Sequence, residues 1–347
     1  MSSEKKIYFV YATNGPIKNT GIETVALGLS TSFSSDVEFF SIKENDANIP
    51  VVDKSDLFWK QNRVVLFTYL EHKNLCQLVK QFQPEAIYVG DWILNYRISL
   101  FKWKPSIINF FKILLGYYRI LKVKRRLRFS NLIYVNELDC FNAQKFGFVN
   151  SVTFPLGHFQ KPDFTDKGKI FFKTDKIAFS GNFDYEPNIN VVDILISFIE
   201  KFPRYSLILV GKSADKFLNL GISNLEIYDN VDSVVETLKA LKPVYVAPLF
   251  FGAGSKNKIL DAAAARVPII CSWECLDNDF QNSIGKNLPL ILQNRSVQNQ
   301  IYNHLLDIES TGWDDKKIYQ KVVRERCWSE ISRKFKYYLD NKCNVIK

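Results

Sequence analysis

A short window, residues 246–261, combines two glycines, two lysines and an aspartate after an apolar run. It reads Val246-Ala-Pro-Leu-Phe-Phe-Gly-Ala-Gly-Ser-Lys-Asn-Lys-Ile-Leu-Asp261. A turn on Gly252 and Gly254 lets a ligand approach the backbone closely, and a helix that starts after it offers unpaired N–H groups and the positive end of its dipole. The window therefore predicts a site for a diphosphate.

The residues after this turn suit the rest of a nucleotide. Ser255 can cap the helix, and Lys256 and Lys258 bring two cations to a place where the dipole already favours negative charge. Lysine is normally unfavourable in a first helical turn, so we expect both to meet an anion. Asp261 lies three residues after Lys258, on the same helix face, where its carboxylate could accept hydrogen bonds from ribose hydroxyls.

Alternating strands and helices must position these residues. Apolar runs rich in β-branched and aromatic residues alternate with stretches of helical spacing such as 23–33 and 75–82, and after a polar connector at 160–168 the pattern restarts, with a helix from about 189 to 202. The predicted strands are 7–11, 37–42, 64–69, 86–89, 132–135, 152–154, 176–179, 207–210, 225–228, 244–247, 269–271 and 289–292. This order predicts an α/β protein with two doubly wound parallel sheets.

Other polar residues follow predicted strands and so fall at carboxyl ends, where open α/β sheets bind ligands. Gly181 allows close approach, Asn182 can donate to a phosphate or sugar oxygen, and Asn188 most simply caps the helix behind it. Tyr185 lies between them, where packing and recognition are both open. Asp91 follows the strand at 86–89 and could act as the general base on an acceptor hydroxyl, or simply cap the next segment.

At this point the sequence resembles the GT-B glycosyltransferases, in particular the large retaining class that uses nucleotide diphosphate sugars (group 1, family 4-like). Besides the glycine window, the resemblance is carried by Ile177-Ala-Phe-Ser-Gly-Asn-Phe-Asp-Tyr-Glu-Pro-Asn188, Leu207-Ile-Leu-Val-Gly211 and Cys327-Trp-Ser-Glu330. It covers the C-terminal half well and the N-terminal half loosely.

The resemblance implies two Rossmann-like domains that face each other across a cleft. It implies an acceptor domain at 1–160, a nucleotide-sugar domain at 161–315 and a C-terminal helix at 316–347 that returns to the first domain. It also implies retention of the anomeric configuration, no bound metal and no cofactor beyond the nucleotide-sugar co-substrate. Gly21, in the turn after the first strand, matches the glycine that the family places under the donor phosphates or the acceptor.

Two positions depart from the family's pattern. Many members have an acidic pair with seven positions between its two residues around the glycine turn, and this chain has Ala253 and the shorter Asp261 there. Members also commonly have an arginine where this chain has Asn182. We therefore expect Lys256 and Lys258 to carry the diphosphate charge alone.

Residues 101–128 are dense in basic, aromatic and aliphatic side chains, ending in Lys122-Val-Lys-Arg-Arg-Leu-Arg128. This composition fits a surface at an anionic membrane, with Trp103 and Tyr117 at headgroup depth and a lipid-linked acceptor within reach. It fits equally a pair of amphipathic helices with a solvated basic face. Nucleic-acid binding ranks below both, because no nucleic-acid-binding fold surrounds the segment.

The composition bounds the class of protein. The chain has 347 residues, 47% hydrophobic and 24% charged, with a formal net charge of +10, which is typical of a folded protein of two domains with an anionic partner. Six scattered cysteines and three histidines make a metal cluster improbable, and no secretory signal occupies residues 1–6. We expect reduced thiols in a protein without a membrane-spanning helix that is cytoplasmic, with a peripheral location on the inner face of the membrane as an option.

These features predict a glycosyltransferase of the hexosyltransferase type, which moves a sugar to a hydroxyl of a glycan or lipid-linked acceptor in cell-surface polysaccharide or glycoconjugate biosynthesis. Lys256 and Lys258 would stabilise the leaving diphosphate, with Asp91 as the third catalytic residue. A nucleotide-sugar epimerase or hydrolase on the same fold is one alternative. A non-catalytic scaffold that docks on membrane is the other.

Overall fold

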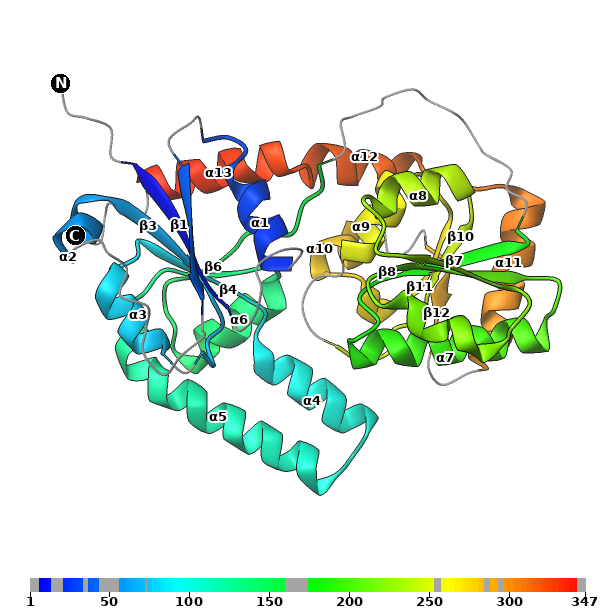
Figure 1. Ribbon diagram of the computed structural model, residues 1–347, viewed down its shortest axis with the longest axis horizontal. Helices are drawn as coiled ribbons and strands as arrows, with labels where there is room; N and C mark the ends of the chain where they lie inside the picture. Colours follow the sequence, from blue (N-terminus) through cyan, green and yellow to red (C-terminus); the bar gives the residue numbers. More distant parts are fainter. Residues whose placement is uncertain are drawn as a thin grey trace. The chain divides into compact units, whose positions relative to one another are not determined.

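The computed structural model describes residues 6–13, 21–33, 37–43, 56–72, 74–159, 174–252, 257–283, 288–292 and 296–341. The chain divides into two compact units: unit 1 comprises Met1–Phe159 with Arg326–Lys347, and unit 2 comprises Gln160–Glu325. Each unit is a parallel sheet with helices against it (Figure 1).

Unit 1 is built on a six-stranded sheet in the order β2-β1-β3-β4-β5-β6, and every pair is parallel. Its strands are β1 (Ile7–Thr13), β2 (Val37–Lys43), β3 (Arg63–Phe67), β4 (Ala86–Gly90), β5 (Leu132–Tyr134) and β6 (Ser151–Thr153). The central strands are buried on both faces, which is why their sequences are nearly continuous apolar runs. The strand order reverses between β1 and β3, so ligands are expected at the carboxyl ends of these two strands.

Seven helices are described in unit 1: α1 (Gly21–Ser30), α2 (Asp56–Gln61), α3 (Leu75–Phe82), α4 (Ile93–Trp103), α5 (Ile107–Leu127), α6 (Glu137–Phe146) and α13 (Trp328–Asn341). The basic segment at 101–128 is mainly α5. Ser106 caps α5, because its side chain accepts a hydrogen bond from the backbone N–H of Asn109 at 3.1 Å.

The segment predicted as a single C-terminal helix is two helices in the structure. Helix α12 (Lys316–Glu325) belongs to unit 2, and α13 belongs to unit 1 and packs on α1. Between them, the Arg326 carbonyl accepts from the His158 N–H at 2.9 Å, and the Trp328 N–H donates to the His158 carbonyl at 3.0 Å. The segment after β6 thus pairs with the segment that leads into α13.

Unit 2 repeats the plan with the order β12-β11-β10-β7-β8-β9, again parallel throughout. Its strands are β7 (Lys176–Ser180), β8 (Ser206–Gly211), β9 (Leu225–Asp229), β10 (Val244–Ala247), β11 (Ile269–Ser272) and β12 (Leu290–Ile291). The order reverses between β7 and β10, whose carboxyl ends lead into the Gly181 and Gly252 loops. The predicted α/β class with two doubly wound parallel sheets is confirmed.

The described helices of unit 2 surround this sheet. They are α7 (Glu186–Lys201), α8 (Val234–Leu241), α9 (Asn257–Ala264), α10 (Asn278–Ser283), α11 (Val297–Thr311) and α12, with short 3-10 segments η1 (Ala214–Leu220) and η2 (Trp273–Cys275). None of the described cysteines, which are Cys76, Cys140, Cys271, Cys275 and Cys327, is in a disulfide.

Candidate functional site

Lys258 lies at the carboxyl end of the unit 2 sheet, in the first turn of α9. Its ammonium Nζ donates to the side-chain Oδ1 of Asn188 at 2.6 Å and lies 5.0 Å from the centre of the Phe179 ring. These contacts hold one cation at the point where the strand order reverses. Gly252, in the loop after β10, has φ of 137°, a backbone conformation that favours glycine.

Three predicted members of this site, Gly254, Ser255 and Lys256, lie outside the described residues, as does Ala253. Their roles stay predictions.

The prediction that Asn188 caps α7 is wrong. The N-cap residue is Tyr185, and Asn188 lies inside the first turn, where it is buried. Its amide Nδ2 donates to the Asn182 carbonyl at 2.7 Å while its Oδ1 accepts from Lys258. Asn188 therefore joins the loop after β7 to the lysine of α9, a tertiary role that the local sequence pattern does not reveal.

Close packing explains the glycines of this loop. A Cβ atom on Gly181 would lie 2.6 Å from the Asn188 amide nitrogen, and one on Gly211, at φ of 132°, would lie 2.2 Å from the Gly181 carbonyl oxygen. The loop after β7 is thus fixed between β8 and α7.

A buried polar pair lies at the end of β7. The Tyr245 hydroxyl is 2.9 Å from the Ser180 hydroxyl and accepts from the Ser180 N–H at 3.2 Å. Burial raises the pKa of Tyr245, and the nearby Asp261 carboxylate raises it further. This hydroxyl is consequently a neutral donor and acceptor near Asp261. No pattern in the sequence indicates this pair, because Tyr245 lies within an apolar strand.

Asp261 lies one turn beyond Lys258 on α9, as the three-residue spacing predicts. Burial raises the pKa of Asp261 to about 7, and the Lys258 ammonium opposes that shift. The carboxyl group therefore changes charge near neutral pH.

The two other predicted donor residues of this loop are more exposed. Asn182 is exposed, and its Oδ1 accepts from the Asp184 N–H at 3.0 Å. Tyr185 is 36% exposed at the start of α7. The structure thus brings Gly181, Asn182, Lys258 and Asp261 together in unit 2, with Tyr185 beside them.

Two predicted residues belong to unit 1. Gly21 begins α1, and the turn before it, 14–20, lies outside the described residues. Asp91 follows β4 and is exposed. After burial, the Asp91 charge is the next cause of the raised pKa of Tyr69 and of Tyr88, which places its carboxylate near both phenols. The N-cap of α4 is Trp92 rather than Asp91.

Comparison with known proteins identifies the second unit. Residues 174–301 match the family model described as glycosyl transferases group 1. This segment has the group 1 glycosyltransferase sequence pattern. It contains every described donor residue named above except Gly21, and it confirms the resemblance inferred from the sequence. No curated protein matches the chain.

Solved structures confirm the GT-B fold over nearly the whole chain. Sucrose-phosphate synthase from Thermosynechococcus elongatus has a TM-score of 0.65 at 12% identity, over 98% of this chain and 100% of that one. Anabaena HepE in complex with UDP and glucose has a TM-score of 0.63 at 11% identity, over 97% and 99%. WaaG, a glycosyltransferase involved in lipopolysaccharide biosynthesis, has a TM-score of 0.54 at 13% identity, over 97% and 95%.

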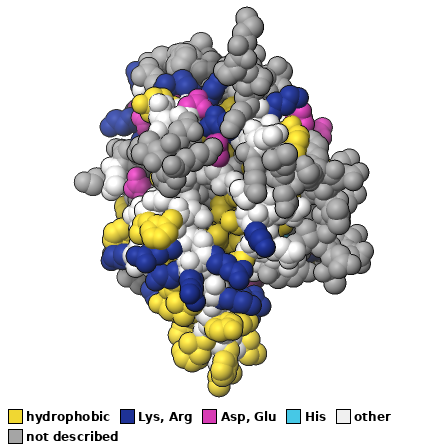
Figure 2. Space-filling model, turned by 90° about the vertical axis from the view of Figure 1, so that its left-hand side faces the viewer, with side chains coloured by type: hydrophobic (Ala, Val, Ile, Leu, Met, Phe, Trp, Pro, Cys, Tyr) yellow, Lys and Arg dark blue, Asp and Glu magenta, His cyan; other side chains and the backbone are white. Residues whose placement is uncertain are grey.

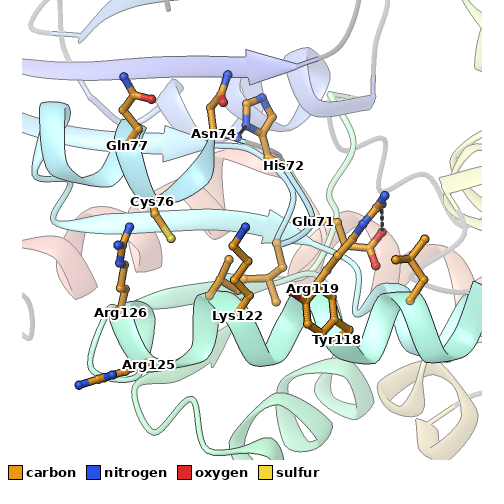
Figure 3. A pocket seen from close by; sticks show the side chains of 13 residues that line it. Glu71, His72, Asn74, Cys76, Gln77, Tyr118, Arg119, Lys122, Arg125 and Arg126 are labelled. Carbon is orange, nitrogen blue, oxygen red and sulfur yellow. Dashed lines mark hydrogen bonds and ion pairs between the residues drawn. The ribbon is translucent and has the colours of Figure 1, made fainter.

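Unit 1 of this GT-B chain contains a pocket of about 1010 Å³ that the sequence analysis missed (Figure 3). The loop and helix after β3 form one wall, and α5 forms the other. The lining residues are Leu70, Glu71, His72, Asn74, Cys76, Gln77, Leu115, Tyr118, Arg119, Lys122, Val123, Arg125 and Arg126. Its signal in the sequence was the position of residues 70–77 directly after a strand at the reversal point.

Glu71, which lines this pocket, forms ion pairs with α4 and α5. Glu71 Oε2 lies 2.5 Å from the Arg97 guanidinium and 3.8 Å from that of Arg119. Arg97 also donates to the Lys112 carbonyl, so it links the loop after β3 to α5.

Among the described residues, no three His, Cys, Asp or Glu side chains are grouped so that they could hold a metal ion. Among the same residues, no helix is both long and apolar enough to cross a membrane.

Proposed function

We propose that this chain transfers a glycosyl group from a nucleoside diphosphate sugar to a hydroxyl of a glycan or lipid-linked acceptor. The observation that carries the proposal is the ammonium of Lys258, fixed by Asn188 at the reversal point of a sheet whose sequence matches group 1 glycosyltransferases. Because HepE is described in complex with UDP and glucose, UDP-glucose is the first donor to test.

The reaction breaks the bond between the anomeric carbon and the diphosphate oxygen and forms a new one to the acceptor oxygen. Negative charge develops on the leaving diphosphate, and the Lys258 ammonium would stabilise it more strongly in the transition state than in the bound donor. Lys256 would add a second cation, and the N–H groups at the start of α9 would donate to the same oxygens. Asp261 would accept from the ribose hydroxyls, with Gly181 and Asn182 against the phosphates or sugar.

The acceptor side of the proposal rests on unit 1. The exposed carboxylate of Asp91 would take the proton that the acceptor hydroxyl loses. The proposal also includes retention of the anomeric configuration, transfer of a hexosyl group, and a role in cell-surface polysaccharide or glycoconjugate synthesis. The fold similarity to WaaG supports the proposed role in synthesis.

Substitution of Lys258 tests the proposal most directly. Lys258→Gln removes the charge but keeps a donor for Asn188, so the fold should survive while kcat/KM for UDP-glucose falls at least about 100-fold. Lys242→Gln, at an exposed lysine after α8, is the matched control and should keep full activity. Unchanged turnover in Lys258→Gln with an unchanged urea midpoint would remove Lys258 from the reaction.

Product analysis separates transfer from the other activities of this fold. The proposal requires a new glycoside whose formation depends on an acceptor and persists in the presence of a chelator. Release of free sugar, or a donor epimer, at the same rate without acceptor would indicate hydrolysis or epimerisation instead. The configuration of the glycoside, read by NMR, tests retention.

A further inference from the structure

The first half of α5 exposes an unusual number of large apolar side chains. Ile107, Ile108 and Phe111 are 73%, 65% and 61% exposed, and the helix also exposes Phe110, Leu114, Leu115, Tyr117, Tyr118 and Leu121. The buried residues of α5 are Gly116, Ile120, Val123 and Leu127, so burial begins near the middle of the helix. The second half therefore anchors the helix on unit 1, and the first half extends beyond the sheet beside α4 (Figure 1). Exposed apolar patches of this kind mark interaction surfaces.

The same hairpin carries the entire charge excess of the chain. Between Asp91 and Glu137 the sequence has ten Lys and Arg residues and no Asp or Glu, and the formal net charge of the whole protein is +10. The remainder of the chain is consequently balanced. Positive charge concentrated on one helical hairpin favours one anionic partner rather than general solubility.

The apolar and basic side chains are segregated in space. Figure 2 shows an apolar tip at the bottom of the molecule with a band of Lys and Arg directly above it. The end of the α4–α5 hairpin lies at the bottom of Figure 1, and Figure 2 is the same molecule turned about the vertical axis, so the tip corresponds to this hairpin. An apolar tip below a belt of cations matches the layers of a bilayer surface, in which acyl chains lie beneath anionic headgroups.

Four cations of the hairpin line the pocket described above: Arg119, Lys122, Arg125 and Arg126. Lys122 and Arg126 point from α5 toward the loop and helix of residues 72–77, whereas Arg119 points toward Glu71 (Figure 3). Glu71 is the one acidic side chain among the lining residues, and it is paired with Arg97. Within the described part of the chain, no ion pair is found for Lys122, Arg125 or Arg126. The pocket thus offers cations that suit a phosphate.

We propose that α4 and α5 dock unit 1 on an anionic lipid bilayer, with the exposed first half of α5 among the headgroups and upper acyl chains. The belt of Lys and Arg binds lipid phosphates, and the pocket takes one headgroup. The proposal does not depend on the transferase reaction, because docking concerns residues outside the donor site and is measured without donor or acceptor.

Vesicle co-sedimentation of the full chain tests it. The protein should bind vesicles of phosphatidylcholine mixed with phosphatidylglycerol, bind vesicles of phosphatidylcholine alone far less, and lose affinity as salt rises. Equal binding to both vesicles, or to neither, would overturn the proposal. Excess inorganic phosphate at matched ionic strength is a further test. If it abolishes binding to the mixed vesicles, the site binds free phosphate and the proposal is overturned.

Paired variants assign the binding to the surface. Lys122→Gln with Arg126→Gln should weaken binding about 30-fold, since each cation near a bilayer contributes a factor of about five. Ile108→Ser with Phe111→Ser should weaken it at least about tenfold by removing apolar insertion. All four side chains are exposed, so thermal midpoints should not move.

Matched controls lie in unit 2. Lys242→Gln with Lys317→Gln removes the same charge, and Leu218→Ser with Leu220→Ser removes exposed apolar side chains of η1. Both control pairs should bind as the unchanged chain does. Equal losses in control and test pairs would refute a defined docking face. Sedimentation velocity tests one other occupant. If the unchanged chain is a dimer and the variant with Ile108→Ser and Phe111→Ser is a monomer, this surface binds a second copy of the chain instead.

Discussion

Asp261 combines two features that give the donor site a pH dependence. It is partly buried in α9, and burial raises its pKa from 3.8 to about 7. Between these two values the folded state keeps a proton that the unfolded state has released. The free energy of unfolding therefore falls as pH rises from about 4 to about 7 and is unaffected by this group outside that window.

Substitution of Asp261 by Asn should remove this dependence. The free energy of unfolding of Asp261→Asn should equal that of the unchanged chain below pH 4 and exceed it by about 4 kcal/mol at pH 8, because each unit of pKa shift corresponds to about 1.4 kcal/mol and the amide does not ionise. Urea unfolding across this range measures the difference. Asp307→Asn, at an exposed position of α11, is the matched control for replacing a carboxylate by an amide. A difference for Asp261→Asn that stays constant across the pH range would show that the pKa of Asp261 is not raised.

Residue types and spacing were enough to single out Lys258 and Asp261 as candidates, but not to show which residues contact Lys258 or lie near Asp261. A glycine turn before a lysine-bearing helix is a local pattern, so it is visible in the sequence. The contact of Asn188 with Lys258 spans 70 positions, and Tyr245 meets Ser180 across 65. Such pairs depend on the order of the strands in the sheet, which cannot be read from the sequence pattern. The position of Asn188 near a helix start therefore predicted only a cap.

At the scale of elements, the contact of α13 with α1 depends on one missing side chain. A Cβ atom on Gly28 would lie 2.0 Å from the Trp328 ring, which is buried. Ser332 fastens the same pair, since its hydroxyl donates to the Leu29 carbonyl at 2.5 Å and accepts from the Ser32 N–H at 2.9 Å. Gly28 is thus required by packing, although glycine inside a helix is unfavourable by itself.

A double-mutant cycle separates packing from helix propensity. Gly28→Ala should cost about 2 kcal/mol of unfolding free energy because of the clash, even though alanine favours the helix by about 1 kcal/mol. Trp328→Ala should cost about 3 to 5 kcal/mol. In the double variant the cavity accepts the new methyl, so Gly28→Ala should become neutral or stabilising. Additive losses in urea unfolding would contradict the proposed contact.

The strands and most helices followed from hydrophobic patterning, since every predicted strand overlaps an observed one. Element ends were less predictable: α7 begins at Glu186 rather than near 189, because Pro187 fits the first turn. The break between α12 and α13 has no local signal such as glycine or proline. It arises where the backbone of 326–328 pairs with His158, a contact between distant parts of the chain.

At the scale of the whole molecule, charge and chemistry are divided between the units. The basic excess lies on α4, α5 and the segments beside them in unit 1, and the lysine and carboxyl group proposed to hold the donor lie in unit 2. The composition gave the sum of the charges. The structure adds that the cations share one surface with exposed apolar side chains. This arrangement is the basis of the proposal that the surface docks on a bilayer.

This division predicts where a nucleoside diphosphate will act. UDP at a hundredfold its dissociation constant should stabilise the folded chain by about 2.7 kcal/mol, because it binds only the folded state. Hydrogen exchange should slow in the loop after β7 and in α9, whose amides surround Lys258, and stay unchanged in the α4–α5 hairpin. Lys258→Gln should lose most of this protection, whereas Lys122→Gln should keep it all. Protection by UDP that centres on the hairpin would place the nucleotide in unit 1 and overturn the assignment of the donor site.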